Sequence, residues 1–292
     1  MSRQSGEHRS RMSEKVKNKR FHIGCQSWQY DDWVTKAAGE TVFYPRGTKS
    51  PEMLSEYARV FDTIEVDSTA YGTPARSTIM GWLESTPENF QFSLKVPRAI
   101  THEFSLGPHS LNIFDEFTDA AQEFGERLGA VLIQLPAAFE ATKVNGQNVR
   151  DFLSRLPSNI RFAIEFRNPG WFVEWTFDEL NERNVALALV AGKWIPEESV
   201  FAAFEKTRTR LGYLRFMGIR DLPSFERVHR ERTAELESWA NMITSSLVAD
   251  NVYIYVDNYF EGHAPATANK LKQMLDQAVV DPASLEPQAS LF

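Results

Sequence analysis

Eight short apolar segments recur along the chain, and each is followed by a stretch with the pattern of an amphipathic helix. The apolar segments are rich in β-branched or aromatic residues and are bounded by Gly, Pro, Asn or Asp, which is typical of strands. The predicted strands cover residues 21–27, 63–68, 90–96, 130–135, 161–167, 185–191, 212–218 and 251–257. The predicted helices cover residues 51–61, 76–85, 110–127, 144–156, 177–184, 197–205, 224–247 and 264–280.

This regular alternation predicts parallel strands that are joined by right-handed helical crossovers. Eight such units within about 260 residues fit a (β/α)8 TIM barrel, whose usual size is roughly 250 residues. We therefore predict an α/β protein with one barrel domain over residues 21–280. A doubly wound open sheet is the alternative, because a single sequence does not fix the number of strands.

Composition excludes several classes of protein. The chain is 42% hydrophobic and 24% charged, with a formal net charge of −7, so it is no polycation built to coat nucleic acid. The single cysteine, Cys25, cannot form an internal disulfide, which suits a reducing cytoplasm. The longest clean apolar run, residues 185–191, is too short to span a bilayer, and no apolar stretch of a secretory signal follows the N-terminus. We predict a soluble cytoplasmic protein without a membrane partner.

The alternation of side chains along the strands predicts an unusual barrel interior. One parity is apolar, as in Ile64 and Val66 or Leu214 and Phe216, and is expected to face the helices. The opposite parity should point to the barrel axis and carries mostly polar and charged side chains: Glu65, Asp67, Gln91, Ser93, Lys95, Gln134, Glu165, Arg167, Arg215, Tyr255 and Asp257. Barrel interiors are normally filled with branched aliphatic residues.

Buried charges must neutralise one another, because one unpaired charge costs several kcal/mol. A purely structural salt-bridge network would explain the pattern, but aliphatic residues often stabilise as well or better, so a functional site is favoured. Active sites of barrels lie at the C-terminal ends of the strands. We therefore predict Lys95, Glu165, Asp67 and His102 as catalytic residues.

The loops on the same face add aromatic and polar side chains. Several aromatic residues on one rim suggest a planar ring, such as a sugar or a base. The start of the predicted helix at residue 264 offers free backbone N–H groups that favour an anion. The predicted substrate-binding residues are Trp28, Tyr71, Arg98, Gln134, Arg167, Trp171, Arg215, Asn258 and His263.

These residues belong to a longer series of motifs that resembles the YecE-like family, also called domain of unknown function 72. The matching stretches are Phe43-Tyr44-Pro45, Glu65-Val66-Asp67-Ser68-Thr69, Phe92-Ser93-Leu94-Lys95-Val96-Pro97, Ile100-Thr101-His102, Val131-Leu132-Ile133-Gln134-Leu135-Pro136, Ala163-Ile164-Glu165-Phe166-Arg167 and Gly262-His263-Ala264. The resemblance implies a (β/α)8 barrel and no established activity. Met217 stands where many members carry His, so a mechanism that relies on that His would not apply here.

The residues give limited support to metal-dependent chemistry and to carbohydrate hydrolysis. A multinuclear zinc site would need more histidines than His102 and His263, but one divalent cation on Asp67, Glu165 and Asp257 stays open. A carbohydrate hydrolase could use Glu65 and Glu165, although basic neighbours would keep both ionised. No motif of an organic cofactor is present. The leading hypothesis is an enzyme, a hydrolase or phosphoesterase, that acts on a phosphate-bearing or other anionic small molecule or on a nucleic-acid fragment. The alternative is a non-catalytic ligand-binding or adaptor barrel.

Both ends of the chain differ from the barrel. Residues 1–20 are basic and nearly free of apolar side chains, which predicts a disordered tail. Residues 281–292 form a predicted flexible tail that ends in Gln288-Ala289-Ser290-Leu291-Phe292. This pentapeptide resembles the bacterial sliding-clamp binding motif, which implies a DNA sliding clamp as partner, bound through Gln288, Leu291 and Phe292.

Overall fold

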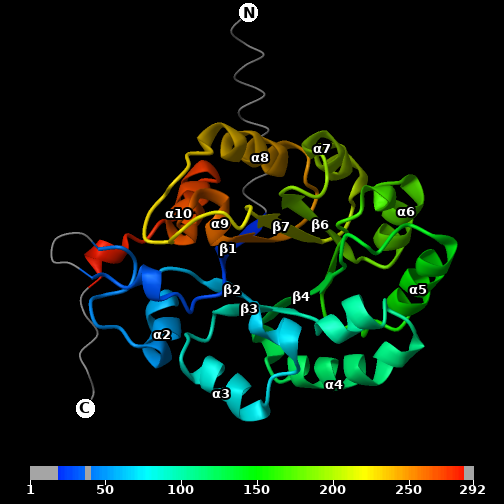
Figure 1. Ribbon diagram of the computed structural model, residues 1–292, viewed down its shortest axis with the longest axis horizontal. Coiled ribbons are helices and arrows are strands. Elements are labelled where there is room, and N and C mark those ends of the chain that lie inside the picture. Colours follow the sequence, from blue (N-terminus) through cyan, green and yellow to red (C-terminus); the bar gives the residue numbers. More distant parts are fainter. Residues whose placement is uncertain (1–18, 37–40, 286–292) are drawn as a thin grey trace, which may run out of the picture.

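Eight parallel strands close into a barrel in the computed structural model, which describes residues 19–36 and 41–285 (Figure 1). The strands are β1 (Arg20–Gln26), β2 (Thr63–Val66), β3 (Gln91–Lys95), β4 (Leu128–Gln134), β5 (Phe162–Glu165), β6 (Ala186–Ala191), β7 (Leu211–Phe216) and β8 (Asn251–Val256). They are hydrogen-bonded in sequence order, and β1 closes the barrel on β8, with Ile23 opposite Ile254. The closed ring confirms the predicted (β/α)8 barrel and excludes the open sheet.

The helices surround the strands (Figure 1). They are α2 (Met53–Tyr57), α3 (Arg76–Glu84), α4 (Leu111–Gln122), α5 (Lys143–Leu153), α6 (Glu174–Glu182), α7 (Glu197–Lys206), α8 (Thr233–Ser245), α9 (Asn258–Glu261) and α10 (Ala264–Met274). Short turns of other helix types lie in the loops, among them the 3-10 helix η3 (Ser68–Tyr71) and the π-helix η4 (Ala99–Glu103). In the part of the chain that the structure describes, no helix combines the length and the apolar character needed to cross a membrane.

The predicted helix over residues 224–247 is wrong in its first third. Residues 224–232 form an extended loop, and α8 begins only at Thr233. The backbone N–H groups of this loop have partners outside it: those of His229 and Arg230 donate to the carbonyl oxygen of Glu261 at 2.7 and 3.0 Å. The N–H of Phe225 donates to the carboxylate of Asp32 at 3.0 Å. Long-range contacts that satisfy the backbone therefore outweigh the local helical pattern.

The structure describes only the residues of the two predicted tails that lie next to the barrel. Lys19 and Arg20 belong to the barrel, because the N–H of Arg20 donates to the carbonyl of Asp250 at 2.8 Å and the Lys19 ammonium to that of Ile243 at 2.8 Å. Near the other end, residues Pro282–Ser284 form a 3-10 turn, and Leu285 packs against the core. Gln288, Leu291 and Phe292 lie outside the described residues.

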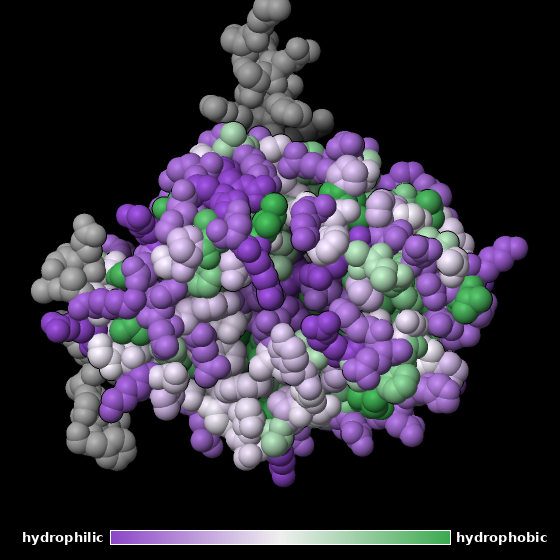
Figure 2. All heavy atoms as spheres, in the orientation of Figure 1, coloured by the Kyte–Doolittle hydropathy of each residue, from purple (hydrophilic) through white to green (hydrophobic). Residues whose placement is uncertain are grey.

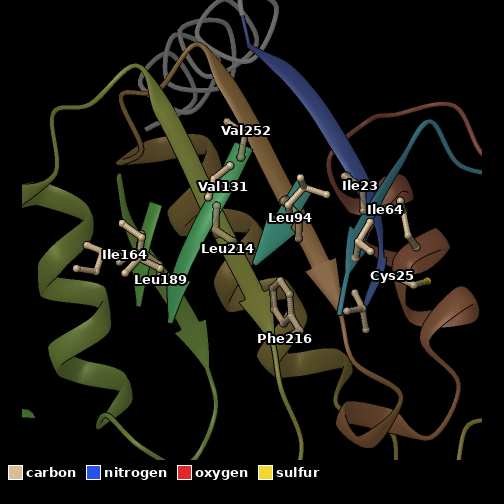
Figure 3. Packing of buried hydrophobic residues seen from close by; sticks show 14 of the residues in the cluster. Ile23, Cys25, Ile64, Leu94, Val131, Ile164, Leu189, Leu214, Phe216 and Val252 are labelled. Carbon is tan, nitrogen blue, oxygen red and sulfur yellow. The ribbon is translucent and has the colours of Figure 1, made fainter. Parts of the chain in front are cut away.

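The strands separate two layers of buried side chains. The apolar parity packs against the helices, and Figure 3 shows such residues from all eight strands, from Ile23 and Cys25 to Val252. Inside the barrel, small residues lie with large aromatic ones: Ala130, Leu132, Ala163, Ala186, Ala188, Leu211, Tyr213, Tyr253 and Tyr255. The Tyr255 hydroxyl bonds to Thr63 at 2.7 Å and to Ser93 at 2.8 Å. The inner layer is thus polar enough to accept charged groups above it.

Candidate functional site

Arg215 is the centre of an ionic network that crosses the barrel. It lies on β7 with 1% of its surface exposed, and its Nη2 is 2.8 Å from Oε1 of Glu65 on β2. Its Nη1 binds Glu165 on β5. Glu65 also accepts the Tyr213 hydroxyl at 2.6 Å and lies 3.2 Å from Nζ of Lys95. One guanidinium on β7 therefore neutralises two buried carboxylates, one from β2 and one from β5.

The network continues toward the C-terminal ends of the strands on both sides. The Lys95 ammonium binds Asp67, which follows β2. Nε of Arg167 lies 2.6 Å from Oε1 of Glu165, and Nε2 of Gln134 donates to Oε2 of Glu165 at 3.1 Å. The resulting chain alternates three carboxylates with three cations, so the inner network is neutral as a unit. The predicted inward direction of these side chains is what the structure shows.

The pairing decides the charge of each carboxyl group. Burial alone would raise the pKa of Glu165, but Arg215 and Arg167 outweigh it and lower that pKa to about 2. Burial likewise opposes ionisation of Asp67, yet the Lys95 ammonium holds the pKa of Asp67 below its usual value. For Arg215, desolvation is overcome by Glu65 and Glu165, which raise the pKa of the guanidinium. At neutral pH these groups are therefore charged and paired.

A cavity of about 500 Å³ lies above this network, at the C-terminal ends of the strands. Hydrophilic residues border the depression in the middle of the face that Figure 2 shows. The lining residues are Gln26, Tyr30, Asp67, Ala70, Tyr71, Lys95, Arg98, His102, Gln134, Arg167, Lys193, Trp194, Met217, Gly218, Ile219, Arg220, Asp257 and Tyr259. Five of them are cationic and two are carboxylates, a formal excess of three positive charges in a chain whose net charge is −7.

Three of the cations that line the cavity form no ion pair with a described residue. Among the described residues, neither Arg98, Lys193 nor Arg220 lies within 4 Å of a carboxylate oxygen. The Lys193 ammonium instead lies 4.5 Å from the ring centre of Trp194, and the Arg167 guanidinium is 5.6 Å from the same ring. Their positive charge is therefore directed at whatever enters the cavity.

Two titratable groups of the lining differ from the paired ones. Burial and the charges of Arg98 and Arg167 lower the pKa of His102, so its ring is neutral at pH 7. Its Nδ1 is 2.8 Å from the Thr101 hydroxyl. Burial raises the pKa of Asp257, although its carboxylate accepts the N–H of Tyr259 and faces the positive charge of Arg215. The cavity thus holds a neutral imidazole and a carboxyl group that burial pushes toward its protonated form.

Some of the predicted site residues line the cavity, and others lie beneath it. Those that line the cavity are Asp67, Lys95, His102, Tyr71, Arg98, Gln134 and Arg167. Glu165 and Arg215 are buried beneath it and do not line it, so Glu165 positions Arg167 and Gln134 from behind.

Four predicted substrate-binding residues lie in the packed interior instead. Trp28 is 5% exposed and meets Trp82 edge-on, and Trp171 is 2% exposed and stacks on Phe166, with ring centres 4.7 Å apart. Because large aromatic side chains stabilise most when buried, a tryptophan after a strand need not reach the substrate.

Asn258 and His263 are also buried, and other parts of the chain bind Oδ1 of Asn258 and Nδ1 of His263. The Oδ1 of Asn258 accepts the indole N–H of Trp33 at 3.1 Å and the backbone N–H of Ala264 at 2.9 Å. The Nδ1–H of His263 donates to the carbonyl of Phe225 at 2.8 Å. At the predicted anion site, the start of α10, the N–H of Ala264 therefore already has a partner.

Several lining residues were not predicted, chiefly Gln26, Tyr30 and Arg220. Gln26 ends β1, and its amide donates to Asp67 at 3.2 Å. The alternation along β1 could have found it, because Ile23 and Cys25 belong to the outer layer. Tyr30 and Arg220 come from loops, where no periodicity indicates a direction.

The predicted cation site on Asp67, Glu165 and Asp257 does not form. No group of three or more His, Cys, Asp or Glu side chains in residues 19–36 and 41–285 is arranged to hold a metal ion. Asp67 and Glu165 belong to separate ends of the ionic network, where Lys95 and Arg167 neutralise them.

Comparison with known proteins places this architecture in a family. A family described as "Protein of unknown function DUF72" matches residues 22–290. This chain belongs to the DUF72 family. The UPF0759 protein YunF of Bacillus subtilis is 26% identical over 295 residues, which is 93% of this chain and 100% of that protein. The UPF0759 protein YecE of Escherichia coli K12 is 29% identical over 154 residues, so that match spans about half of each chain.

Solved DUF72 structures share the barrel. A DUF72 protein from Thermotoga maritima has a TM-score of 0.69 and 22% identity, covering 88% of this chain and 100% of that one. Another from Enterococcus faecalis has a TM-score of 0.67 and 21% identity, covering 92% and 100%. The family and the fold are thereby established, and the family description names no activity.

The ionic network makes a prediction about stability and pH. Arg215→Met should lower the free energy of unfolding at pH 7 by about 3–5 kcal/mol, because two buried carboxylates lose their shared partner. In the parent protein the ionised Glu165 stabilises the folded state at pH values above about 4.3, which is its pKa in the unfolded chain. This contribution is lost as the pH falls toward about 2, which is its pKa in the folded protein. In the variant Glu165 keeps Arg167 but loses Arg215, so its pKa rises and it takes up a proton more readily. The deficit should therefore shrink between pH 7 and pH 4.

Urea unfolding at both pH values measures the deficit. Arg76→Met is the matched control, since Arg76 pairs with Glu123 on the exposed surface and should change little. An equal deficit at pH 7 and pH 4 would contradict the assignment of the loss to buried carboxylates.

Proposed function

We propose that this DUF72 protein is a hydrolase that acts on a phosphate-bearing small molecule in the cavity above the ionic network. The observation that carries the proposal is the group of cations Arg98, Lys193 and Arg220, which surround a cavity of about 500 Å³ without carboxylate partners among the described residues. A cavity of this size suits a small organic ligand. Phosphate matches such cations in charge and in its need for several hydrogen-bond donors.

The inner network supports this function by preorganisation. Lys95 and Arg167 reach the cavity, while carboxylates behind them hold their positions. Cations that are already oriented stabilise charge on a reacting phosphoryl group without rearrangement during the reaction. We assign Lys95 to contact the phosphoryl oxygens, and Asp67 to orient Lys95 while remaining ionised.

The proton transfers are assigned to His102 and Asp257. The oxygen of a water molecule attacks phosphorus, and the bond from phosphorus to the leaving oxygen breaks. The Asp257 carboxylate accepts a proton from that water, and His102, which the bound phosphate protonates, gives a proton to the leaving oxygen. Both groups then exchange protons with solvent, which restores the starting state.

The other hypotheses gain less from the geometry. A carbohydrate hydrolase that uses Glu65 and Glu165 would need one of them as a proton donor, but Arg215 binds both and both are buried below the cavity. An adaptor role would not require cations with no carboxylate partner around a cavity. Recruitment to a sliding clamp through Gln288, Leu291 and Phe292 is compatible with either function and stays a separate proposal.

Turnover of phosphate esters tests the central proposal. A screen of phosphomonoesters and of DNA with abasic sites should find a substrate whose kcat/KM falls about 10- to 100-fold in Arg98→Ala, because a charge-assisted hydrogen bond is lost. Lys95→Ala should lose at least as much. Arg76→Ala removes an exposed arginine outside the cavity and should keep full activity. Absence of turnover together with absence of phosphate binding would refute the proposal.

Anion binding should also be visible at His102. In the free protein burial, Arg98 and Arg167 hold the pKa of His102 below its usual value, and a phosphate group beside it should raise this pKa, because the negative charge stabilises the imidazolium. NMR titration of the histidine side chains with and without inorganic phosphate measures the change. The exposed His109 lies outside the cavity and serves as the internal control. An unchanged His102 pKa at saturating phosphate would contradict the assignment.

The clamp proposal has its own experiment. A pull-down with purified bacterial sliding clamp should retain the full chain and lose a variant that ends at Pro287. Leu291→Ala with Phe292→Ala should behave like the truncation, because the two apolar side chains are the expected anchors. Equal retention of the full chain and the truncated chain would show that the tail is not the clamp contact.

A further inference from the structure

A second hollow adjoins the cavity and shares a wall with it. This outer groove has a volume of about 570 Å³ and is formed by the segments that follow β2 and β3, together with α4. Its lining residues are Ala70, Tyr71, Gly72, Thr73, Pro97, Arg98, Ala99, His102, Glu103, Ile113 and Glu116. Ala70, Tyr71, Arg98 and His102 line both spaces. A ligand bound at these shared residues can therefore extend into the cavity on one side and into the outer groove on the other.

The two spaces differ in charge. Beyond the shared residues, the outer groove adds the carboxylates of Glu103 and Glu116 and no cation. Neither carboxylate forms an ion pair with any residue that the structure describes. The outer groove therefore disfavours a second anionic group and favours hydrogen-bond donors. The cavity, with its excess of positive charge, favours the opposite.

The shared wall presents an aromatic ring with no partner. Tyr71 ends η3 and is 75% exposed, and within the described residues its ring contacts no other ring and no cation. Trp194, the other exposed aromatic residue of the lining, already lies against Lys193 and Arg167. An exposed, unpartnered ring beside a groove is suited to stacking on a planar group.

We propose that the ligand is a nucleoside monophosphate, with its phosphate in the cavity and its base in the outer groove against Tyr71. This inference rests on the proposed function and adds the chemical class of the organic group. A base supplies both a planar ring for Tyr71 and N–H donors for Glu103 and Glu116. The ester bond then crosses the shared wall, where His102 and Arg98 lie.

Calorimetric titration of the full chain with three probes tests the assignment: inorganic phosphate, adenosine 5′-monophosphate and adenosine 3′,5′-bisphosphate. The monophosphate should bind about tenfold or more tightly than inorganic phosphate, because stacking adds to the phosphate contacts. Tyr71→Leu should remove that advantage and leave the affinity for inorganic phosphate unchanged. Tyr71→Phe keeps the ring and should restore it.

A second comparison in the same titration tests the charge of the outer groove. The bisphosphate should bind more weakly than the monophosphate, and Glu103→Gln combined with Glu116→Gln should reduce that difference. Asp119→Asn removes an exposed charge from α4 outside the groove and should have no effect. If the monophosphate binds no more tightly than phosphate, the inference is wrong while the proposed function stands. If neither inorganic phosphate nor the monophosphate binds, the proposed function fails as well.

Discussion

The pairing of Arg215 with Glu65 and Glu165 is the interaction on which the site depends. Charges in a barrel interior are costly unless they are neutralised, and here one guanidinium from β7 holds carboxylates from β2 and β5. Those carboxylates in turn hold Lys95 and Arg167 at the floor and wall of the cavity. The barrel interior therefore holds an ionic network where aliphatic side chains are usual, and this network fixes the positions of Lys95 and Arg167.

This arrangement separates a neutral interior from a positive mouth. The three carboxylates and three cations of the network balance, whereas the residues that line the cavity carry a formal excess of three positive charges. The contrast with the net charge of −7 for the whole chain directs small anions to one place on an otherwise acidic protein. The outer groove beside it adds two carboxylates, those of Glu103 and Glu116, and no further cation.

The fold and the network could be predicted because both follow from periodic patterns. Strand–helix alternation determines the barrel, and alternation along each strand determines which side chains point inward, as with Glu65 and Lys95. Loop residues carry no such signal. Trp28 and Trp171 pack in the interior, while Tyr30 and Arg220 line the cavity, and nothing local distinguishes these cases. The loop before α8 departs from its helical pattern because distant residues satisfy its backbone.

Anomalous diffraction from crystals soaked in tungstate would test the central claim most directly. Tungstate is a tetrahedral dianion like phosphate, and the anomalous signal of tungsten shows where the ion binds without assumptions about the natural ligand. With protein prepared free of phosphate and sulfate, the account predicts a strong tungsten peak in the cavity, within hydrogen-bond reach of Lys95 and Arg98. A cavity without tungsten, in crystals where the ion occupies other surface lysines or arginines, would contradict it.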